Sequence, residues 1–190
     1  MSTALRRHIE SIVPLNDEEF TYILSHFTEK HFRKHQFIEQ EGNYVKYDYF
    51  LIEGLTKTFF TNEQGKEHIL EFAMDNYWVT DIQALQNETQ STLNISCLSN
   101  CHVLSISKQK IEKLCAEVDK MQFYFRKKAM NENALLQKRI LCLIKNNAAA
   151  RYHDLASNHP ELIQKVPKTL IASYVGVSRE TLSRMLMKHV

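Results

Sequence analysis

The most informative stretch of the chain is VGVSRETLSRMLMKHV, which runs from Val175 to Val190. Gly176 supplies the positive φ that a tight reversal between two helices requires. Ala172, four residues earlier, is small enough to let two helices approach closely. Apolar residues occupy the positions that would face a shared core: Ile171, Val175, Val177, Leu182 and Met185. We therefore expect two helices joined by a short turn.

The second of these helices would expose a surface able to read DNA bases. Arginine can donate two parallel hydrogen bonds to guanine, and glutamate can accept one from cytosine. We assign base reading to Arg179, Glu180, Ser183 and Arg184. Contacts to phosphates fix the register of a protein on DNA without reading its sequence. To these we assign Lys168, Thr169, Ser178, Thr181 and Lys188. The alternative is an amphipathic surface helix whose charges are only solvated.

Charge is segregated along the chain, although the net charge is only +2. Residues 1–115 contain 11 Lys and Arg against 16 Asp and Glu, whereas residues 116–190 contain 13 against 6. A basic C-terminal part suits a polyanion such as nucleic acid. Solvated basic helix faces produce the same excess, so charge supports DNA binding without deciding it.

Composition indicates a globular protein rather than a disordered or membrane-spanning one. The 190 residues are 44% hydrophobic, with four glycines and three prolines, and a chain of this length can bury a sizeable core. The sequence contains no apolar run of about 18 residues and no secretory signal, so we expect a cytoplasmic protein without a membrane span. The four scattered cysteines favour free thiols.

Apolar periodicity predicts an α+β fold. Two short helical patterns come first, and Asn16 and Glu19 form a capping box before the second. From Phe37 the pattern alternates, with turns at spaced glycines, as in an antiparallel β-roll or jelly roll. Helical periodicity then returns. We expect a β-roll over 1–115, a long helix over 116–145 and a small helical domain over 146–190.

The stretch IASYVGVSRETLSRML, Ile171 to Leu186, resembles the helix-turn-helix of the cyclic AMP receptor protein/FNR (Crp/Fnr) family of bacterial transcription regulators. The order of β-roll, long helix and terminal domain resembles that family over nearly the whole chain. The resemblance implies a cyclic-nucleotide-binding-like β-roll and a homodimer joined by its long helices. It also implies a palindromic operator in double-stranded DNA with half-sites about 34 Å apart. RNA polymerase is a further candidate partner.

One departure from this family concerns the end of the chain. Family members usually continue past the reading helix into a β-hairpin wing that touches phosphates, whereas this sequence stops at Val190. We therefore expect a helix-turn-helix that lacks a full wing. Fewer phosphate contacts would make its DNA affinity less dependent on salt.

A second departure concerns the nucleotide cassette of the family, in which a Gly-Glu pair binds the ribose and an arginine neutralises the cyclic phosphate. Ungapped alignment places Thr80 and Asp81 at the Gly-Glu positions and Ser91 at the arginine. A buried phosphate without a cation carries an unfavourable desolvation free energy of several kcal/mol, and Asp81 would add repulsion. We predict no response to cyclic AMP and no cofactor, although the aromatic-lined roll could hold an unidentified small effector.

The residues favour neither an enzyme nor a metal site. The sequence shows no Ser/His/Asp order, phosphate-binding glycine loop or paired carboxylates. Cys97 and Cys101 cannot complete a tetrahedral site alone, and a cupin-type metal centre would need more than the neighbouring His68 and Glu71. His31 and the other strand histidines are interpreted as exposed, and haem binding through one of them stays open.

Together these patterns predict a sequence-specific DNA-binding transcriptional regulator of Crp/Fnr type. The first alternative is a ligand-binding β-roll that acts through protein partners without binding DNA. A β-barrel metalloenzyme is the weaker alternative.

Overall fold

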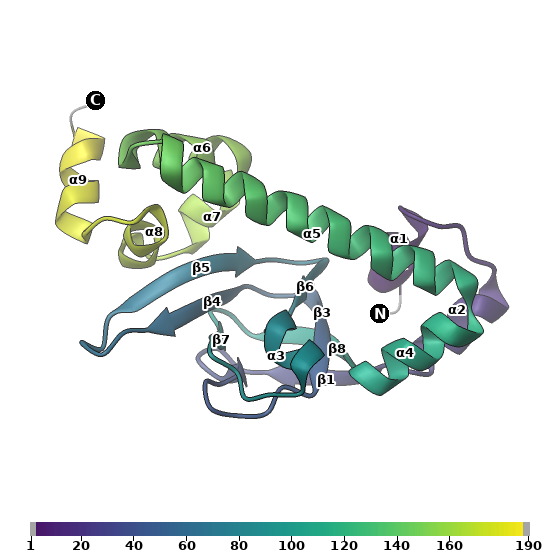
Figure 1. Cartoon of the computed structure of the whole chain (residues 1–190). Coiled ribbons are helices and arrows are strands. Elements are labelled where there is room, and N and C mark those ends of the chain that lie inside the picture. Colours follow the sequence, from purple (N-terminus) through teal and green to yellow (C-terminus); the bar gives the residue numbers. More distant parts are fainter. Residues whose placement is uncertain (1–2, 188–190) are drawn as a thin grey trace. The chain divides into compact units, whose positions relative to one another are not determined.

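The computed structural model describes residues 3–187 and divides into two compact units (Figure 1). The first unit comprises Met1–Phe60 and Glu71–Met130, and the second comprises Thr61–Leu70 and Asn131–Val190. The long helix α5 (Asp119–Lys145) contributes to both units.

Between residues 3 and 187, eight strands form two four-stranded sheets. The strands of one sheet are β1 (Thr28–Phe32), β3 (Tyr47–Glu53), β6 (Tyr77–Val79) and β8 (Cys101–Ser107). Those of the other are β2 (Phe37–Glu39), β4 (Thr56–Thr61), β5 (Glu67–Ala73) and β7 (Asn94–Cys97). Their spatial orders are β1-β8-β3-β6 and β2-β7-β4-β5. The antiparallel roll predicted from the alternating apolar pattern is confirmed.

Strands β3 and β8 are buried on both faces, and each contributes residues to two apolar clusters, one on either side of the sheet. Leu51 and Val103 face the other sheet and pack with Ile38 and Ile95. On the opposite face, alternate residues of the same strands pack against helices. The residues of this second cluster are Leu5, Ile9, Val13, Ile23, Phe50, Trp78, Leu104, Ile106, Leu114, Met121 and Tyr124. Each fully buried apolar side chain of this size stabilises the fold by about 1.5–3 kcal/mol.

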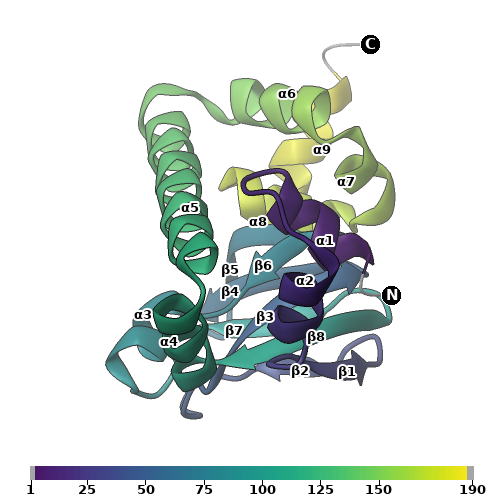
Figure 2. The ribbon, with the colours of Figure 1, turned by 90° about the vertical axis from the view of Figure 1, so that its right-hand side faces the viewer.

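The helices of the first unit cover this outer face. They are α1 (Thr3–Glu10), α2 (Asp17–Leu24) and α4 (Lys108–Glu117), together with the first turns of α5, and a short α3 (Ile82–Asn87) lies elsewhere in the unit. Figure 2 shows α1 and α2 beside the sheet that contains β3 and β8. The predicted capping box of α2 is confirmed: the Glu19 amide donates to Asn16 Oδ1 over 2.8 Å, and the Asn16 amide donates to Glu19 Oε2 over 2.9 Å.

Buried polar groups fix the start of α5 to the sheet. Lys128 Nζ forms an ion pair with Asp48 Oδ2 at 3.0 Å, and both side chains are almost fully buried. Trp78 Nε1 donates a hydrogen bond to the Tyr124 hydroxyl over 2.9 Å. Breaking such a pair by removing one partner would leave a buried charge without compensation. The N-terminal turns of α5 are therefore an integral part of the first unit.

The second unit contains the C-terminal half of α5 and four further helices: α6 (Ala148–Asn158), α7 (Pro160–Lys165), α8 (Lys168–Val175) and α9 (Arg179–Met187). Pro160 stands at the first position of α7, where its missing amide hydrogen is not needed. Over the described residues, no helix combines the length and the apolar character that crossing a membrane requires.

Candidate nucleic-acid interface and effector cassette

Helices α8 and α9 meet at the turn that the sequence predicts. Gly176 has φ +80°, and its amide donates to the Ser173 carbonyl over 3.1 Å, which ends α8. Any other residue at this position would be strained by its Cβ. The predicted core residues are buried or half-buried: Ile171, Ala172, Val175 and Leu182 are at most 2% exposed, and Val177 and Met185 are half-buried.

The first turn of α9 is organised by Ser178. Its Oγ accepts a hydrogen bond from the Thr181 amide over 3.2 Å, as expected for a capping residue. A hydrogen bond from its own backbone amide lowers the pKa of Glu180, and one from the Ser178 side chain lowers it further. The Glu180 side chain is therefore a carboxylate near neutral pH, the form that accepts hydrogen bonds.

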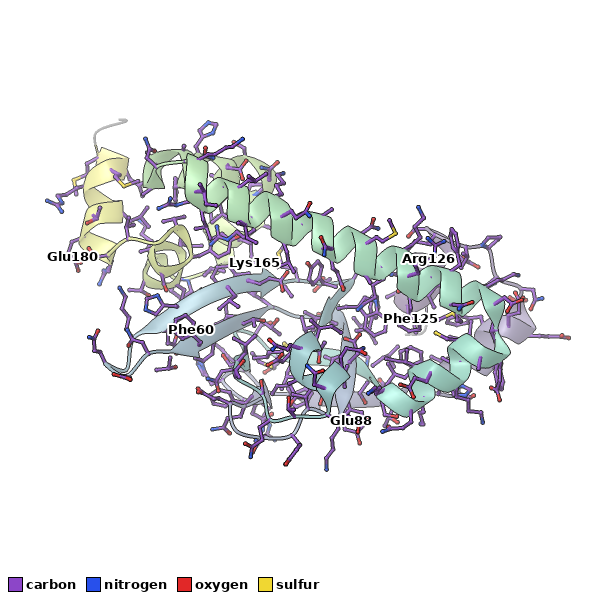
Figure 3. All side chains as sticks on the ribbon, in the orientation of Figure 1. Phe60, Glu88, Phe125, Arg126, Lys165 and Glu180 are labelled. Atoms are coloured by element: carbon purple, nitrogen blue, oxygen red, sulfur yellow. The ribbon has the colours of Figure 1, made fainter. Side chains whose placement is uncertain are left out.

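One face of α9 carries all four predicted base-reading residues. The side chains of Arg179, Glu180, Ser183 and Arg184 are exposed. Figure 3 shows Glu180 at the start of α9, on the outer edge of this group of helices. Because residues one turn apart lie on the same side of a helix, these four side chains form a single polar surface. We call it the α9 face.

The predicted phosphate contacts lie around the same turn. Lys168, Thr169 and Ser178 are exposed, and Thr181 is half-buried with its hydroxyl 3.2 Å from the Ser178 hydroxyl. Lys188 lies outside the described residues. The exposed members offer donors to a backbone without competing intramolecular ion pairs among the described residues.

Two arginines that sequence reasoning counted only as basic charge hold α8 in place. Arg151 Nε donates to the Val175 carbonyl over 2.8 Å, and its Nη1 donates to the Asn146 carbonyl over 2.6 Å. The Arg139 guanidinium lies 3.7 Å from the centroid of the Tyr174 ring and donates to the carbonyl of the same residue. Both cations satisfy carbonyls at the negative end of α8. A charge count cannot distinguish such internal use from an exposed basic surface.

The three aligned cassette positions are hydrogen-bonded within the protein. Ser91 Oγ donates to Asp81 Oδ2 over 3.0 Å, and the Thr92 amide donates to the same oxygen over 3.2 Å. The other oxygen of Asp81 accepts from the Ala84 amide over 3.1 Å and caps α3. Thr80 donates to the Tyr47 carbonyl over 3.0 Å. Asp81 and Ser91 are both at least 96% buried, so their polar groups face each other rather than solvent.

A second set of polar groups lies inside the roll. Burial raises the pKa of Glu39 to about 7, while a hydrogen bond with Tyr49 and the charge of Lys30 oppose the shift. The charge of Asp81 acts in the same direction as burial. Lys30 Nζ also lies 3.9 Å from the centroid of the Tyr47 ring. Sequence analysis missed this group because it depends on contacts between strands.

The family comparison agrees with this architecture. Residues 29–118 match the family described as the cyclic nucleotide-binding domain. None of the curated proteins is similar enough in sequence to count as a relative.

Solved structures share the fold over most of the chain. FixK2 from Bradyrhizobium japonicum is 20% identical, with a TM-score of 0.69, and the match covers 85% of this chain and 83% of that one. A putative Crp/Fnr-family transcriptional regulator from Eubacterium rectale is 15% identical, with a TM-score of 0.72 and coverages of 92% and 83%. A CooA variant from Carboxydothermus hydrogenoformans is 17% identical, with a TM-score of 0.73 and coverages of 92% and 81%. The fold expected from the resemblance to Crp/Fnr regulators is confirmed.

Proposed function

We propose that the chain is a transcriptional regulator that binds DNA sequence-specifically through the α9 face. The observation that carries this proposal is the division of α9 into two sides. Leu182 is 1% exposed, whereas Arg179 and Arg184 are exposed on the other side of the same helix. A helix anchored by its apolar side and presenting arginines outward suits the major groove. Proteins of the same fold are named as regulators, which supports this role.

The active form is a homodimer joined through α5. The C-terminal half of this helix exposes a run of large apolar side chains, with Leu136 60% exposed and Ile144 75% exposed. The run comprises Leu135, Leu136, Ile140, Leu141, Leu143 and Ile144. A contiguous apolar surface of this kind is typical of an interaction site. A second copy of α5 covers it by symmetry, and two α9 faces related by a two-fold axis then read a palindromic operator.

The regulator does not respond to cyclic AMP. The position that the family resemblance gives to a cationic arginine holds Ser91, whose hydroxyl donates to Asp81. The Asp81 carboxylate already accepts three hydrogen bonds and would repel a phosphate placed beside it. The additional buried carboxyl of Glu39 makes the interior still less suited to an anion. RNA polymerase is the further partner expected of a regulator that activates transcription.

Selection of bound fragments from random duplex DNA tests this function. The full chain should enrich a palindrome whose half-sites lie about one helical turn apart. Fluorescence polarisation on the enriched site, with and without cyclic AMP, should give the same affinity. Failure to enrich any sequence would favour the alternative, a β-roll module that acts through protein partners.

A further inference from the structure

A group of metal-binding residue types lies on the edge of the first sheet, away from the cassette. Glu29 and His31 are on β1, and His102 is on β8. The Cα atoms of His31 and His102 are direct partners across the antiparallel ladder. Side chains two residues apart on a strand share a face, so Glu29 joins the two histidines on that face.

The donor atoms of these three residues are close enough to share one ion. His102 Nε2 lies 2.5 Å from Glu29 Oε1, and His31 Nε2 lies 4.0 Å from the same oxygen. One donor atom from each of the three residues falls within 4.8 Å of the other two. Ligands around a tetrahedral zinc ion are about 3.4 Å apart, given metal–ligand bonds of about 2.0–2.2 Å. The observed separations bracket this value, so small side-chain rotations complete the geometry.

The environment of His102 points independently to a ligand. Its Nε2 is buried and forms no hydrogen bond among the described residues, although it lies 2.5 Å from Glu29 Oε1. An unsatisfied buried nitrogen is unfavourable, and coordination of an ion would remove the penalty. The His31 side chain is 70% exposed and leaves a route for the ion from solvent. Glu53, the partner of His102 on β3, lines a surface hollow together with His31 and His102.

We propose that Glu29, His31 and His102 form a binding site for a divalent transition metal of the zinc class. Imidazole nitrogens with one carboxylate oxygen suit this class better than the oxygen-only sites of magnesium and calcium. Three protein ligands leave a fourth position for water. The ion joins the edge strand β1 to β8, which continues directly into α4. Neither DNA binding nor a nucleotide is needed for this site to operate.

Isothermal titration of the chelator-treated full chain with Zn²⁺ tests the proposal. The wild-type chain should bind one ion per chain at this site. Loss of a group that only supports a metal ligand weakens affinity about 10- to 100-fold, so His31→Ala and His102→Ala should weaken binding at least as much. His153→Ala is the matched control, because His153 is an exposed histidine on α6 outside the group. Its affinity should equal that of the wild type.

A second measurement distinguishes loss of a metal ligand from loss of the fold. His102 is mostly buried, so circular dichroism without metal establishes whether its alanine variant folds. His31→Ala removes an exposed side chain, and Glu29→Gln preserves size while removing the anionic oxygen. Zinc should raise the melting temperature of the wild type and of His153→Ala but not that of His31→Ala. Absence of zinc uptake by the wild type, or unchanged uptake by both His31→Ala and Glu29→Gln, would overturn the proposal.

Discussion

The α9 face and the cassette around Asp81 use charged residues in opposite ways. On α9, Arg179 and Arg184 are exposed, and the helix is held from its apolar side by Leu182. In the cassette, the carboxylate of Asp81 is buried and accepts hydrogen bonds from Ser91 and from two backbone amides. The α9 face therefore exposes its charged groups to solvent, whereas the cassette satisfies its carboxylate within the fold.

Leu182 holds α9 to the other helices by its apolar side. Of the substitutions considered, Leu182→Ala is therefore expected to lower stability the most. Leu182 is 1% exposed, and truncating a buried leucine costs about 2–5 kcal/mol. Urea unfolding followed by circular dichroism should show this loss, together with lost DNA binding. Met187→Ala, at a 70% exposed position of the same helix, is the control and should leave stability unchanged. Equal stability of both variants would mean that α9 is not seated through Leu182.

The interior carboxyl of Glu39 gives the next effect, which depends on pH. Its pKa is raised from 4.5 to about 7 in the folded protein, so the folded state binds this proton more tightly than the unfolded state. The contribution of Glu39 therefore makes the fold less stable as the pH rises from about 4.5 to about 7, by up to about 3 kcal/mol. Urea midpoints of the wild type and of Glu39→Gln at pH 5 and pH 8 measure this effect. Between these two pH values, the stability of the variant should fall less than that of the wild type. Identical pH dependence in both proteins would contradict the assignment.

The contribution of the hydrogen bonds around Asp81 to stability is tested by Asp81→Ala. The change leaves the amides of Ala84 and Thr92 without their acceptor, and an unsatisfied buried donor costs about 1–3 kcal/mol. Thermal unfolding should show the loss. Glu88→Ala is the control, because the Glu88 side chain is exposed at the other end of α3, where it pairs with Lys108. An Asp81→Ala protein as stable as the wild type would show that these hydrogen bonds do not hold the cassette.

Direct reading by the α9 face is tested by Arg184→Ala on the enriched operator. The loss of a bidentate contact to guanine should cost about 1–3 kcal/mol on the operator and much less on random DNA. Polarisation titrations on both duplexes measure this ratio. Lys165→Ala removes an exposed lysine of α7 and should change neither affinity. Unaltered discrimination in Arg184→Ala would mean that Arg184 does not read bases.

The smallest effect is expected from Lys168→Ala. Lys168 begins α8, is exposed and is assigned to a phosphate. Its removal should weaken operator and random DNA alike and reduce the slope of log affinity against log salt by about 1. Titrations at several salt concentrations provide the slope. A loss confined to the operator would place Lys168 among the base-reading residues instead.

Features encoded by neighbouring residues could be predicted from the sequence, whereas those that depend on strand register could not. The turn at Gly176 and the capping box of Asn16 and Glu19 are local, and both have the predicted geometry. Cys97 and Cys101 are buried, and both thiols are free. In contrast, His31 meets His102 only because β1 pairs with β8 in one register. Sequence reasoning compared His68 with Glu71 instead, because it could see only neighbours along the chain.

The internal role of Arg139 and Arg151 was equally hidden, since a count of basic residues assigns every arginine the same weight. The structure shows both guanidinium groups on the carbonyls of Tyr174 and Val175. Part of the C-terminal positive charge is therefore not available to a polyanion.

The contacts of Arg151 have a mechanical consequence. One guanidinium joins the carbonyl of Asn146, directly after α5, to the carbonyl of Val175, the last residue of α8. In the homodimer that we propose, the angle at which the two copies of α5 cross would therefore set the distance between the two copies of α9. Any ligand that changes that angle would change the preferred spacing of the operator without touching a single base-reading side chain.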